Sequence, residues 1–256
     1  MTNKERLVRT INRQPVDRLL TWDFIDNEKI LSQYGGYDSS RKYSFEELTE
    51  LNLRAFREIG LDITRFIYDP VDHWIRFFGV DSREWEVSKK GGTSWISKRP
   101  FKTISELEKN MPKMPDFEEV RDWFEPLITY IGQVFDGNDI VFIGGVEGPM
   151  SDSYTYMDME LFSMAIYDAP EIVAHVMDCT AAFSEYMARI YAENATAPIL
   201  FMGEDICCVS GPIFSPEFLR REALPRWRKI REPISQKGYA FIYHSDGLYG
   251  NALPLI

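Results

Sequence analysis

The chain has 256 residues, of which 45% are hydrophobic and 14% aromatic, so it can bury one sizeable core and is not composed like a disordered protein. Its formal net charge of -11 would repel nucleic acid phosphates and anionic lipids, because proteins bind both through Lys and Arg. No apolar run approaches the roughly 20 residues that cross a bilayer, and no signal-peptide apolar region follows Met1, so we expect a cytoplasmic protein that binds neither nucleic acid nor membrane.

The first part of the chain alternates helical and extended patterns. The predicted elements are, in order, a helix at 5–13, a strand at 19–24, a helix at 44–59 and a strand at 62–68. Pro15 and Gly60 end the two helices. Polar and apolar residues then alternate before Gly91-Gly92, and Trp95-Ile96 follows it, which predicts a β-hairpin insertion near 84–99.

The same alternation continues through the second part of the chain. The predicted elements are helices at 103–110 and 117–135, a strand at 139–145, helices at 159–167 and 170–194, a strand at 198–203, a helix opened by Ser215 and a strand at 239–244. Strands that alternate with helices predict a parallel sheet, either open or closed as a barrel. A dinucleotide-binding sheet needs glycines at its first turn, and the segment 22–26 contains none.

We therefore predict a single domain, residues 1–256, that forms a TIM-type (β/α)8 barrel truncated after about five of its eight β/α units. Such a barrel leaves the strand at 239–244 as an open edge. Because open edges recruit other chains, we also expect a homo-oligomer. The three cysteines, which include the neighbours Cys207 and Cys208, are a poor disulfide framework and favour a reducing compartment.

Ionisable residues follow every predicted strand. Parallel strands place their carboxyl ends on one side of a sheet, so these side chains should meet in one crevice, where they suit proton transfer or metal binding. Acidic residues also cap helices, and for Asp23 or Asp69 alone capping is the simpler interpretation. For the whole set of ionisable residues, a shared functional site is the better interpretation. Its members are Asp23, Asp69, Glu147, Glu204, Asp205, His244 and Asp246.

A metal site is predicted at the last two strands. His244 and Asp246 are separated by one residue, so both can face the crevice, and Glu204 or Cys207 would complete three zinc-compatible ligands. For Cys207 a buried apolar role is the simpler interpretation. Tyr154 and Tyr156, beyond the third strand, can stack on a ligand or donate a hydrogen bond to it, although core packing is equally plausible for one of them.

Several segments resemble one family and occur in its order along the chain. They are Glu5 to Arg18, Gly148-Pro149 to Met157, Gly203 to Asp205, Ser215 to Pro225 and His244-Ser245-Asp246-Gly247. The sequence is similar to the uroporphyrinogen decarboxylase superfamily, which also contains corrinoid-dependent methyltransferases. The resemblance implies an (α/β)8 barrel with its pocket at the carboxyl ends of the strands, and it implies that the last three units are missing here.

Two departures separate the branches of this superfamily. Decarboxylases carry an Arg-Gln-Ala-Gly-Arg-Tyr segment after the first strand, where this chain has Trp22-Asp-Phe-Ile-Asp-Asn-Glu28, and carboxylates cannot replace arginines that clamp substrate carboxylates. Tyr156 does match the tyrosine of the decarboxylases. Zinc-dependent methyltransferases of this group present His-x-Cys, and Asp246 occupies that Cys position here. A carboxylate makes zinc a stronger Lewis acid, suited to releasing a methyl group from an ether or amine.

The resemblance thus implies a corrinoid-protein-dependent methyltransferase for a small methylated compound, with the corrinoid supplied by a partner protein. The assigned residues are His244, Asp246 and Glu204 for zinc, Trp22, Asp69, Glu147 and Tyr154 for the small-molecule substrate, and Asp23, Asp205 and Tyr156 for catalysis. Two alternatives stay open. One is a decarboxylase-like carboxy-lyase without a cofactor, in which Asp23 or Asp205 transfers the proton. The other is a non-catalytic fragment that binds a partner.

Overall fold

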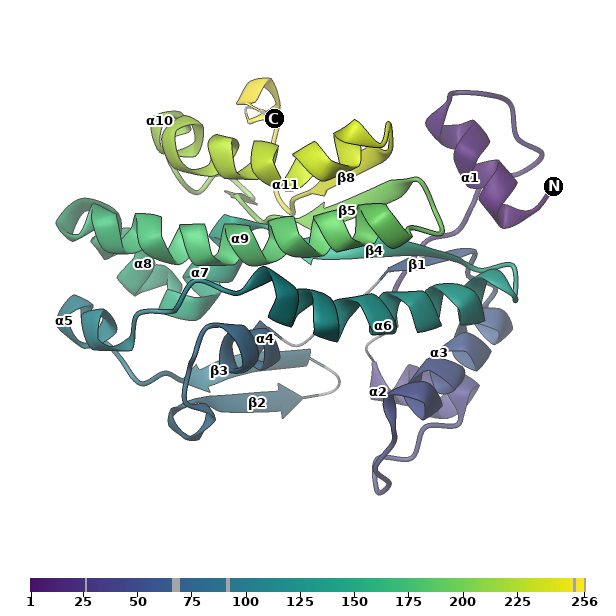
Figure 1. The fold of residues 1–256 in the computed structure, drawn as a ribbon, viewed down its shortest axis with the longest axis horizontal. Coiled ribbons are helices and arrows are strands. Elements are labelled where there is room, and N and C mark those ends of the chain that lie inside the picture. Colours follow the sequence, from purple (N-terminus) through teal and green to yellow (C-terminus); the bar gives the residue numbers. More distant parts are fainter. Residues whose placement is uncertain (26, 66–69, 91–92, 251, 256) are drawn as a thin grey trace.

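The computed structural model describes residues 1–25, 27–65, 70–90, 93–250 and 252–255. A parallel sheet with strand order β1-β4-β5-β8 runs through its centre (Figure 1). Its strands are β1 (Ile63–Arg65), β4 (Val141–Glu147), β5 (Ile199–Gly203) and β8 (Ala240–His244). Each of these strands pairs in parallel with the next one of the sheet, which confirms the predicted α/β alternation. Within the described ranges, this sheet is open and does not close into a barrel.

The predicted strand at 19–24 forms only one bridge to the sheet. Trp22 pairs in parallel with Ile63, beside β1, where a first barrel strand would lie. The ladder does not extend, because the carboxylate of Asp62 accepts hydrogen bonds from the backbone N–H and the hydroxyl of Thr21, at 2.9 and 3.0 Å. That carboxylate also accepts two bonds from Arg18, at 2.6 and 2.7 Å. Backbone hydrogen bonds still join Thr21 and Asp23 to residues 62 and 63, but the Thr21 N–H bonds to the Asp62 side chain, and the pairing is limited to one bridge. The prediction of a full strand at 19–24 is therefore wrong.

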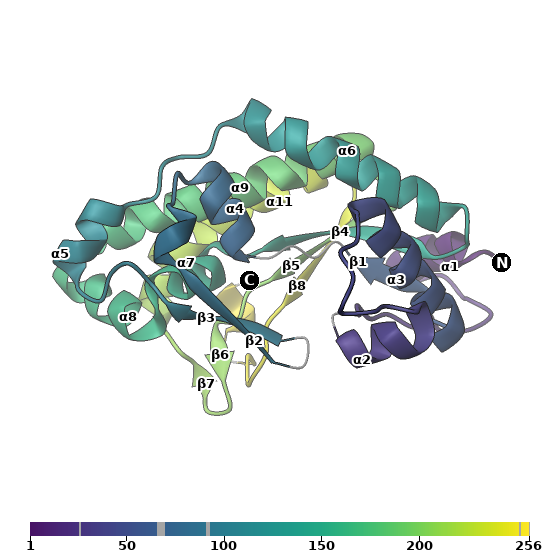
Figure 2. The same ribbon diagram turned by 90° about the horizontal axis from the view of Figure 1, so that it is seen from below.

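Long helices cover one face of the sheet. Helices α6 (Phe117–Asp136), α9 (Pro170–Asn194) and α11 (Leu224–Gln236) lie side by side along it (Figures 1 and 2). Alternate strand residues, Phe142, Leu200 and Met202 among them, belong to the core on this face. Helices α6 and α9 match the predicted ranges closely, since apolar side chains recur at helical spacing in each. The helix predicted to open at Ser215 begins there as the short α10 (Pro216–Phe218), and α11 starts only at Leu224.

The opposite face of the sheet carries a smaller apolar cluster. Its strand residues are Ile63, Val141, Ile143, Ile199 and Phe201. Helix α1 (Asn3–Ile11) adds Leu7 to this cluster, and its Asn3 side chain donates to the carbonyl of Asp139, just before β4 begins. Helix α1 therefore lies at the amino ends of the strands and leaves their carboxyl ends open to ligands.

The predicted hairpin is present, with β2 (Glu86–Lys90) antiparallel to β3 (Thr93–Lys98). The helices at 44–59 and 103–110 begin where Ser44 and Thr103 form capping boxes. The remaining elements are α2 (Glu28–Ile30), η1 (Leu31–Gly35), α3 (Phe45–Ile59), α4 (Pro70–Phe77), η2 (Ser82–Glu84), α5 (Ile104–Leu107), η3 (Glu108–Asn110), α7 (Pro149–Met157), α8 (Met159–Asp168), β6 (Cys207–Cys208), β7 (Gly211–Pro212), α10 (Pro216–Phe218), η4 (Leu219–Ala223) and η5 (Leu253–Leu255). None of the helices in the described part of the chain has the length and apolarity that a bilayer span requires.

Candidate functional site

The four strands of the sheet end in Arg65, Glu147, Gly203 and His244. Glu147 lies beside Gly203 in the register, and Gly203 lies beside His244, so these three residues form one row across the carboxyl edge. Paired residues in a parallel sheet point to the same face. The row belongs to the face of the Phe201 cluster, because Phe201 is two residues before Gly203 on the same strand. Glu147 and His244 therefore flank a position without a side chain.

Three potential metal ligands meet at one end of this row. Ligand atoms of Asp205, His244 and Asp246 all lie within 4.8 Å of one another. His244 Nε2 is 3.5 Å from Asp246 Oδ1, close to the roughly 3.4 Å that separates two ligands of a tetrahedral zinc. The Asp246 side chain is 82% exposed and that of His244 45% exposed, so a cation could enter from solvent. One imidazole and two carboxylates are donors that suit zinc.

The surrounding chain holds these ligands in place. Asp205 Oδ1 accepts a hydrogen bond of 2.7 Å from the backbone N–H of Asp246, which links the exits of β5 and β8. The Asp205 N–H donates to the Ser151 hydroxyl at 2.8 Å, and the hydroxyl of Tyr154 donates to the Asp205 carbonyl at 3.0 Å. Burial raises the pKa of Tyr154, so this tyrosine stays a donor. Tyr154 thus positions the backbone of Asp205.

Glu204 lies outside this cluster, although the sequence interpretation made it a zinc ligand. Its side chain is fully buried and accepts hydrogen bonds from the N–H groups of Met150 and Ser151, at 3.0 and 2.9 Å. Trp227 Nε1 adds a third bond, at 2.7 Å. Residues alternate between the faces of a strand, so Glu204 points toward the helices where Gly203 and Asp205 point toward the site. Asp205 supplies the carboxylate that was expected from Glu204.

An arginine that the sequence analysis did not single out reaches the other end of the row. The guanidinium of Arg65 lies over the rings of Phe24 and Phe201, 4.7 and 4.6 Å from their centroids. Its Nη1 is 4.0 Å from Glu147 Oε1, and its side chain is 12% exposed. The available signal was an arginine inside the predicted strand at 62–68, two residues after Ile63 and so on the same face as Ile63.

Glu147 carries a perturbed carboxyl group. Burial raises its pKa to about 7, and the nearby Arg65 charge opposes that rise. A carboxyl with a pKa near neutrality can both hold and release a proton at physiological pH. Glu147 lies in the same row of strand ends as His244, and a shared crevice stays a prediction.

The other predicted residues lie in different surroundings. Trp22 packs its ring 5.2 Å from that of Phe201, at the edge of the site, and the Asp23 carboxylate accepts a bond from the N–H of Phe24. Tyr156 is 1% exposed and donates its hydroxyl to the Asn110 carbonyl at 2.7 Å, so it is part of the core, which corrects its expected catalytic placement. Asp69 lies outside the described residues.

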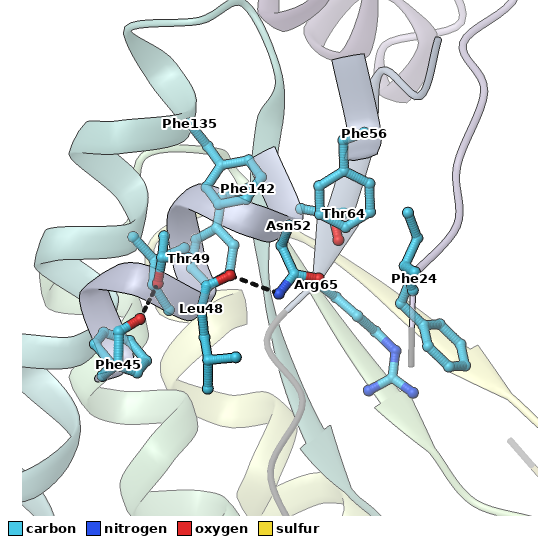
Figure 3. A pocket seen from close by; sticks show the side chains of 12 residues that line it. Phe24, Phe45, Leu48, Thr49, Asn52, Phe56, Thr64, Arg65, Phe135 and Phe142 are labelled. Carbon is cyan, nitrogen blue, oxygen red and sulfur yellow. Dashed lines mark hydrogen bonds between the residues drawn. The ribbon is translucent and has the colours of Figure 1, made fainter. Parts of the chain in front are cut away.

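A separate apolar cavity of about 270 Å³ lies on the helix-covered side of β1 (Figure 3). Its walls include Phe56 and Thr49 of α3, Phe135 of α6 and Phe142 of β4. Arg65 and Phe24 also line this cavity, and the Arg65 guanidinium extends away from Phe56, Phe135 and Phe142 toward Phe24, as Figure 3 shows. The charged end of Arg65 thus lies between this cavity and Glu147 in the row of strand ends.

Comparison with known proteins places the whole chain in one group. The uroporphyrinogen decarboxylase (URO-D) family model matches residues 2–256. The methylcobamide:CoM methyltransferases MtbA of Methanosarcina mazei and Methanosarcina acetivorans are 21% and 22% identical over 257 residues, covering 100% of this chain and 73% of each relative. The solved structure of a methyltransferase from Methanosarcina mazei has a TM-score of 0.69 at 16% identity, again covering 100% of this chain and 73% of that chain. This likeness shows a shared fold.

Proposed function

Since the chain belongs to the uroporphyrinogen decarboxylase family, we propose that it is a methyltransferase that moves a methyl group from a small methylated compound to the corrinoid of a partner protein. Both MtbA relatives are methylcobamide:CoM methyltransferases, so they also handle a methyl group carried by a corrinoid, which supports this branch of the family. The four parallel strands would belong to a (β/α)8 barrel, as the similar methyltransferase fold suggests.

The observation that carries this proposal is the meeting of Asp205, His244 and Asp246 at the carboxyl ends of neighbouring strands. These residues would hold zinc, which when bound supplies a Lewis acid that polarises the heteroatom carrying the methyl group. The ring of His244 lies 5.5 Å from that of Phe201, which keeps the imidazole beside the gap over Gly203. The small substrate would occupy that gap, between Glu147 and His244.

A decarboxylase-like lyase is the second candidate. The observation that favours it is Arg65, whose guanidinium could hold a substrate carboxylate at the strand ends. A single arginine binds fewer substrate carboxylates than the arginine-rich segment that the decarboxylases carry after their first strand. This chain has acidic residues there, between Trp22 and Glu28. We therefore rank the methyltransferase first.

Metal analysis tests the proposal directly. The purified chain should retain about one zinc per molecule after dialysis without chelator, and His244→Ala should lose it, because three protein ligands are the usual minimum for a zinc site. Glu217→Ala, which removes an exposed carboxylate with a 76% exposed side chain on α10, should keep the metal. Zinc retained equally by His244→Ala and the wild type would exclude the proposed ligand set.

A further inference from the structure

The apolar cavity beside β1 is walled by aromatic rings that pack on other rings of the core. Its walls include Phe45 and Phe56 of α3, Phe135 of α6 and Phe142 of β4, all drawn in Figure 3. The ring centroid of Phe135 lies 5.6 Å from that of Phe56 and 6.4 Å from that of Phe142, and the centroids of Phe45 and Tyr130 are 6.0 Å apart. Since core packing holds these rings, the shape of the cavity does not need a ligand to form it.

The size of the cavity suits a single substituted ring. Its volume of about 270 Å³ exceeds the roughly 150 Å³ of an engineered apolar cavity that binds benzene. Phenylalanine walls favour an aromatic ligand, because aromatic rings gain from edge-to-face and offset contacts with one another. Leu48, which also lines the cavity, is 36% exposed, so it marks the side from which a ligand can enter.

Two polar side chains of the wall define which polar group the ligand should carry. Thr64 is 3% exposed and pairs with Phe142 in the parallel register, so its side chain faces the helices as that of Phe142 does. The Asn52 amide nitrogen donates to the Leu48 carbonyl at 2.8 Å. In the described part of the chain, neither the Thr64 hydroxyl nor the Asn52 amide oxygen takes part in a hydrogen bond. A ligand hydroxyl could donate to one and accept from the other.

The charges of the wall favour a neutral ligand. Arg65 is the one charged residue among the described residues that line the cavity, and its guanidinium extends away from Phe56, Phe135 and Phe142 toward Phe24 (Figure 3). An ionised group placed among the phenylalanine rings would lose its hydration away from that charge, which is costly. A neutral hydroxyl loses far less, and Thr64 and Asn52 can replace its bonds to water.

We propose that this cavity binds a small neutral aromatic alcohol of the phenol class. The ring lies among the phenylalanines, and the hydroxyl bonds to Thr64 and Asn52. The candidate metal ligands Asp205, His244 and Asp246 do not line the cavity, so this binding site does not depend on the proposed function.

Isothermal titration with 4-methylphenol tests the proposal on the whole chain. We expect a Kd of roughly 0.1 mM, a moderate affinity per atom for so small a ligand. Thr64→Val keeps the branched shape of the side chain and removes its hydroxyl, so 4-methylphenol should bind about fivefold more weakly. Toluene, which has no hydroxyl, should change less than about twofold. Thr10→Val, which alters an exposed threonine of α1, should match the wild type with both probes.

Thr49→Leu tests the cavity itself rather than the hydrogen bonds. Thr49 lines the cavity from α3, is 7% exposed and donates its hydroxyl to the Phe45 carbonyl, so leucine adds volume without leaving a donor unpaired. Both probes should bind at least about tenfold more weakly, since the larger side chain occupies their space. The urea midpoint of this variant should not fall below that of the wild type, because cavity filling and leucine in a helix are stabilising.

Four results would overturn the inference. The first is a wild-type chain that gives no binding heat with 4-methylphenol, and the second is equal binding by Thr49→Leu and the wild type. Unchanged 4-methylphenol affinity in Thr64→Val would remove the assigned role of the hydroxyl. If 4-methylbenzoate binds as tightly as 4-methylphenol, the site selects an anion through Arg65 instead. Should Thr49→Leu fail to fold, the comparison of the two probes in Thr64→Val decides alone.

Discussion

At the scale of single residues, the neighbours Glu204 and Asp205 point to opposite faces of the sheet. Glu204 is fully buried among the N–H groups that open α7 and the indole of Trp227, while Asp205 faces the site. Gly148 makes this approach feasible, since a Cβ there would lie 2.0 Å from Glu204 Oε2. Sequence order places both acids at a strand exit but does not say which one turns inward. The period of two along the strand, counted from Phe201, assigns them correctly.

Replacing Glu204 by alanine should destabilise the fold strongly. The change leaves two buried donors and one partly buried donor without their acceptor, and each unsatisfied buried group costs about 1–3 kcal/mol, so we expect a loss of about 2–6 kcal/mol. Urea denaturation of Glu204→Ala and the wild type measures it. Glu217→Ala serves as the exposed control and should lose less than about 0.5 kcal/mol. A Glu204→Ala midpoint equal to that of the control would show that these bonds do not support the fold.

At the scale of elements, predictions succeeded where local chemistry sets a boundary. Some helix ends could be predicted directly from local residues. These are the capping boxes at Ser44 and Thr103 and the αL glycine Gly60. The two-residue strands β6 and β7 were not predicted, because so short a pairing depends on tertiary contacts rather than on a repeated pattern. The expected strand at 19–24 failed for a related reason: Asp62, distant in sequence, competes for the backbone of Thr21.

The β6–β7 hairpin supports the segment that carries Asp246. The Leu248 N–H donates to the Cys208 carbonyl at 2.9 Å, and the Ile206 N–H donates to the Ser245 hydroxyl at 3.2 Å. Gly247, between them, has a φ of +86° and faces the backbone of Cys207 and Cys208. The candidate ligands His244 and Asp246 are therefore held by a neighbouring hairpin as well as by β8.

Gly247→Ala should weaken zinc binding more than it weakens the fold. A Cβ at this position would lie 2.7 Å from the Cys208 carbonyl oxygen in a backbone conformation that costs alanine about 1–3 kcal/mol, so the segment must move and carry Asp246 with it. Isothermal titration with zinc compares this variant with Gly250→Ala, where nothing lies within 4 Å of the added carbon. We expect at least about tenfold weaker binding for Gly247→Ala only, the size of effect seen when outer-shell support is lost. Equal affinities would show that the hairpin does not position the ligands.

At the scale of the whole molecule, helix α1 and the candidate metal ligands lie at opposite edges of one sheet. Helix α1 lies at the amino ends with Leu7, while the strand ends at Arg65, Glu147 and His244 remain accessible. The order of strands and helices predicts this arrangement for the fold, and the acids at the strand exits remain a predicted site. The charge of -11 also favours a cation at the carboxyl edge. The identity of the inward-facing cation, Arg65, required the structure.

Zinc should stabilise the folded chain as a whole if the ligand cluster binds it. A ligand that binds only the folded state adds about 2.7 kcal/mol at a free concentration of 100 times its Kd. The adjacent Cys207 and Cys208 of the unfolded chain also attract zinc, so the measured gain should be somewhat smaller. Urea denaturation with and without buffered zinc tests this in the wild type and in His244→Ala, which should show no gain. A gain of the same size in His244→Ala would place the metal elsewhere in the molecule, and chelation by EDTA should return the wild type to its zinc-free midpoint.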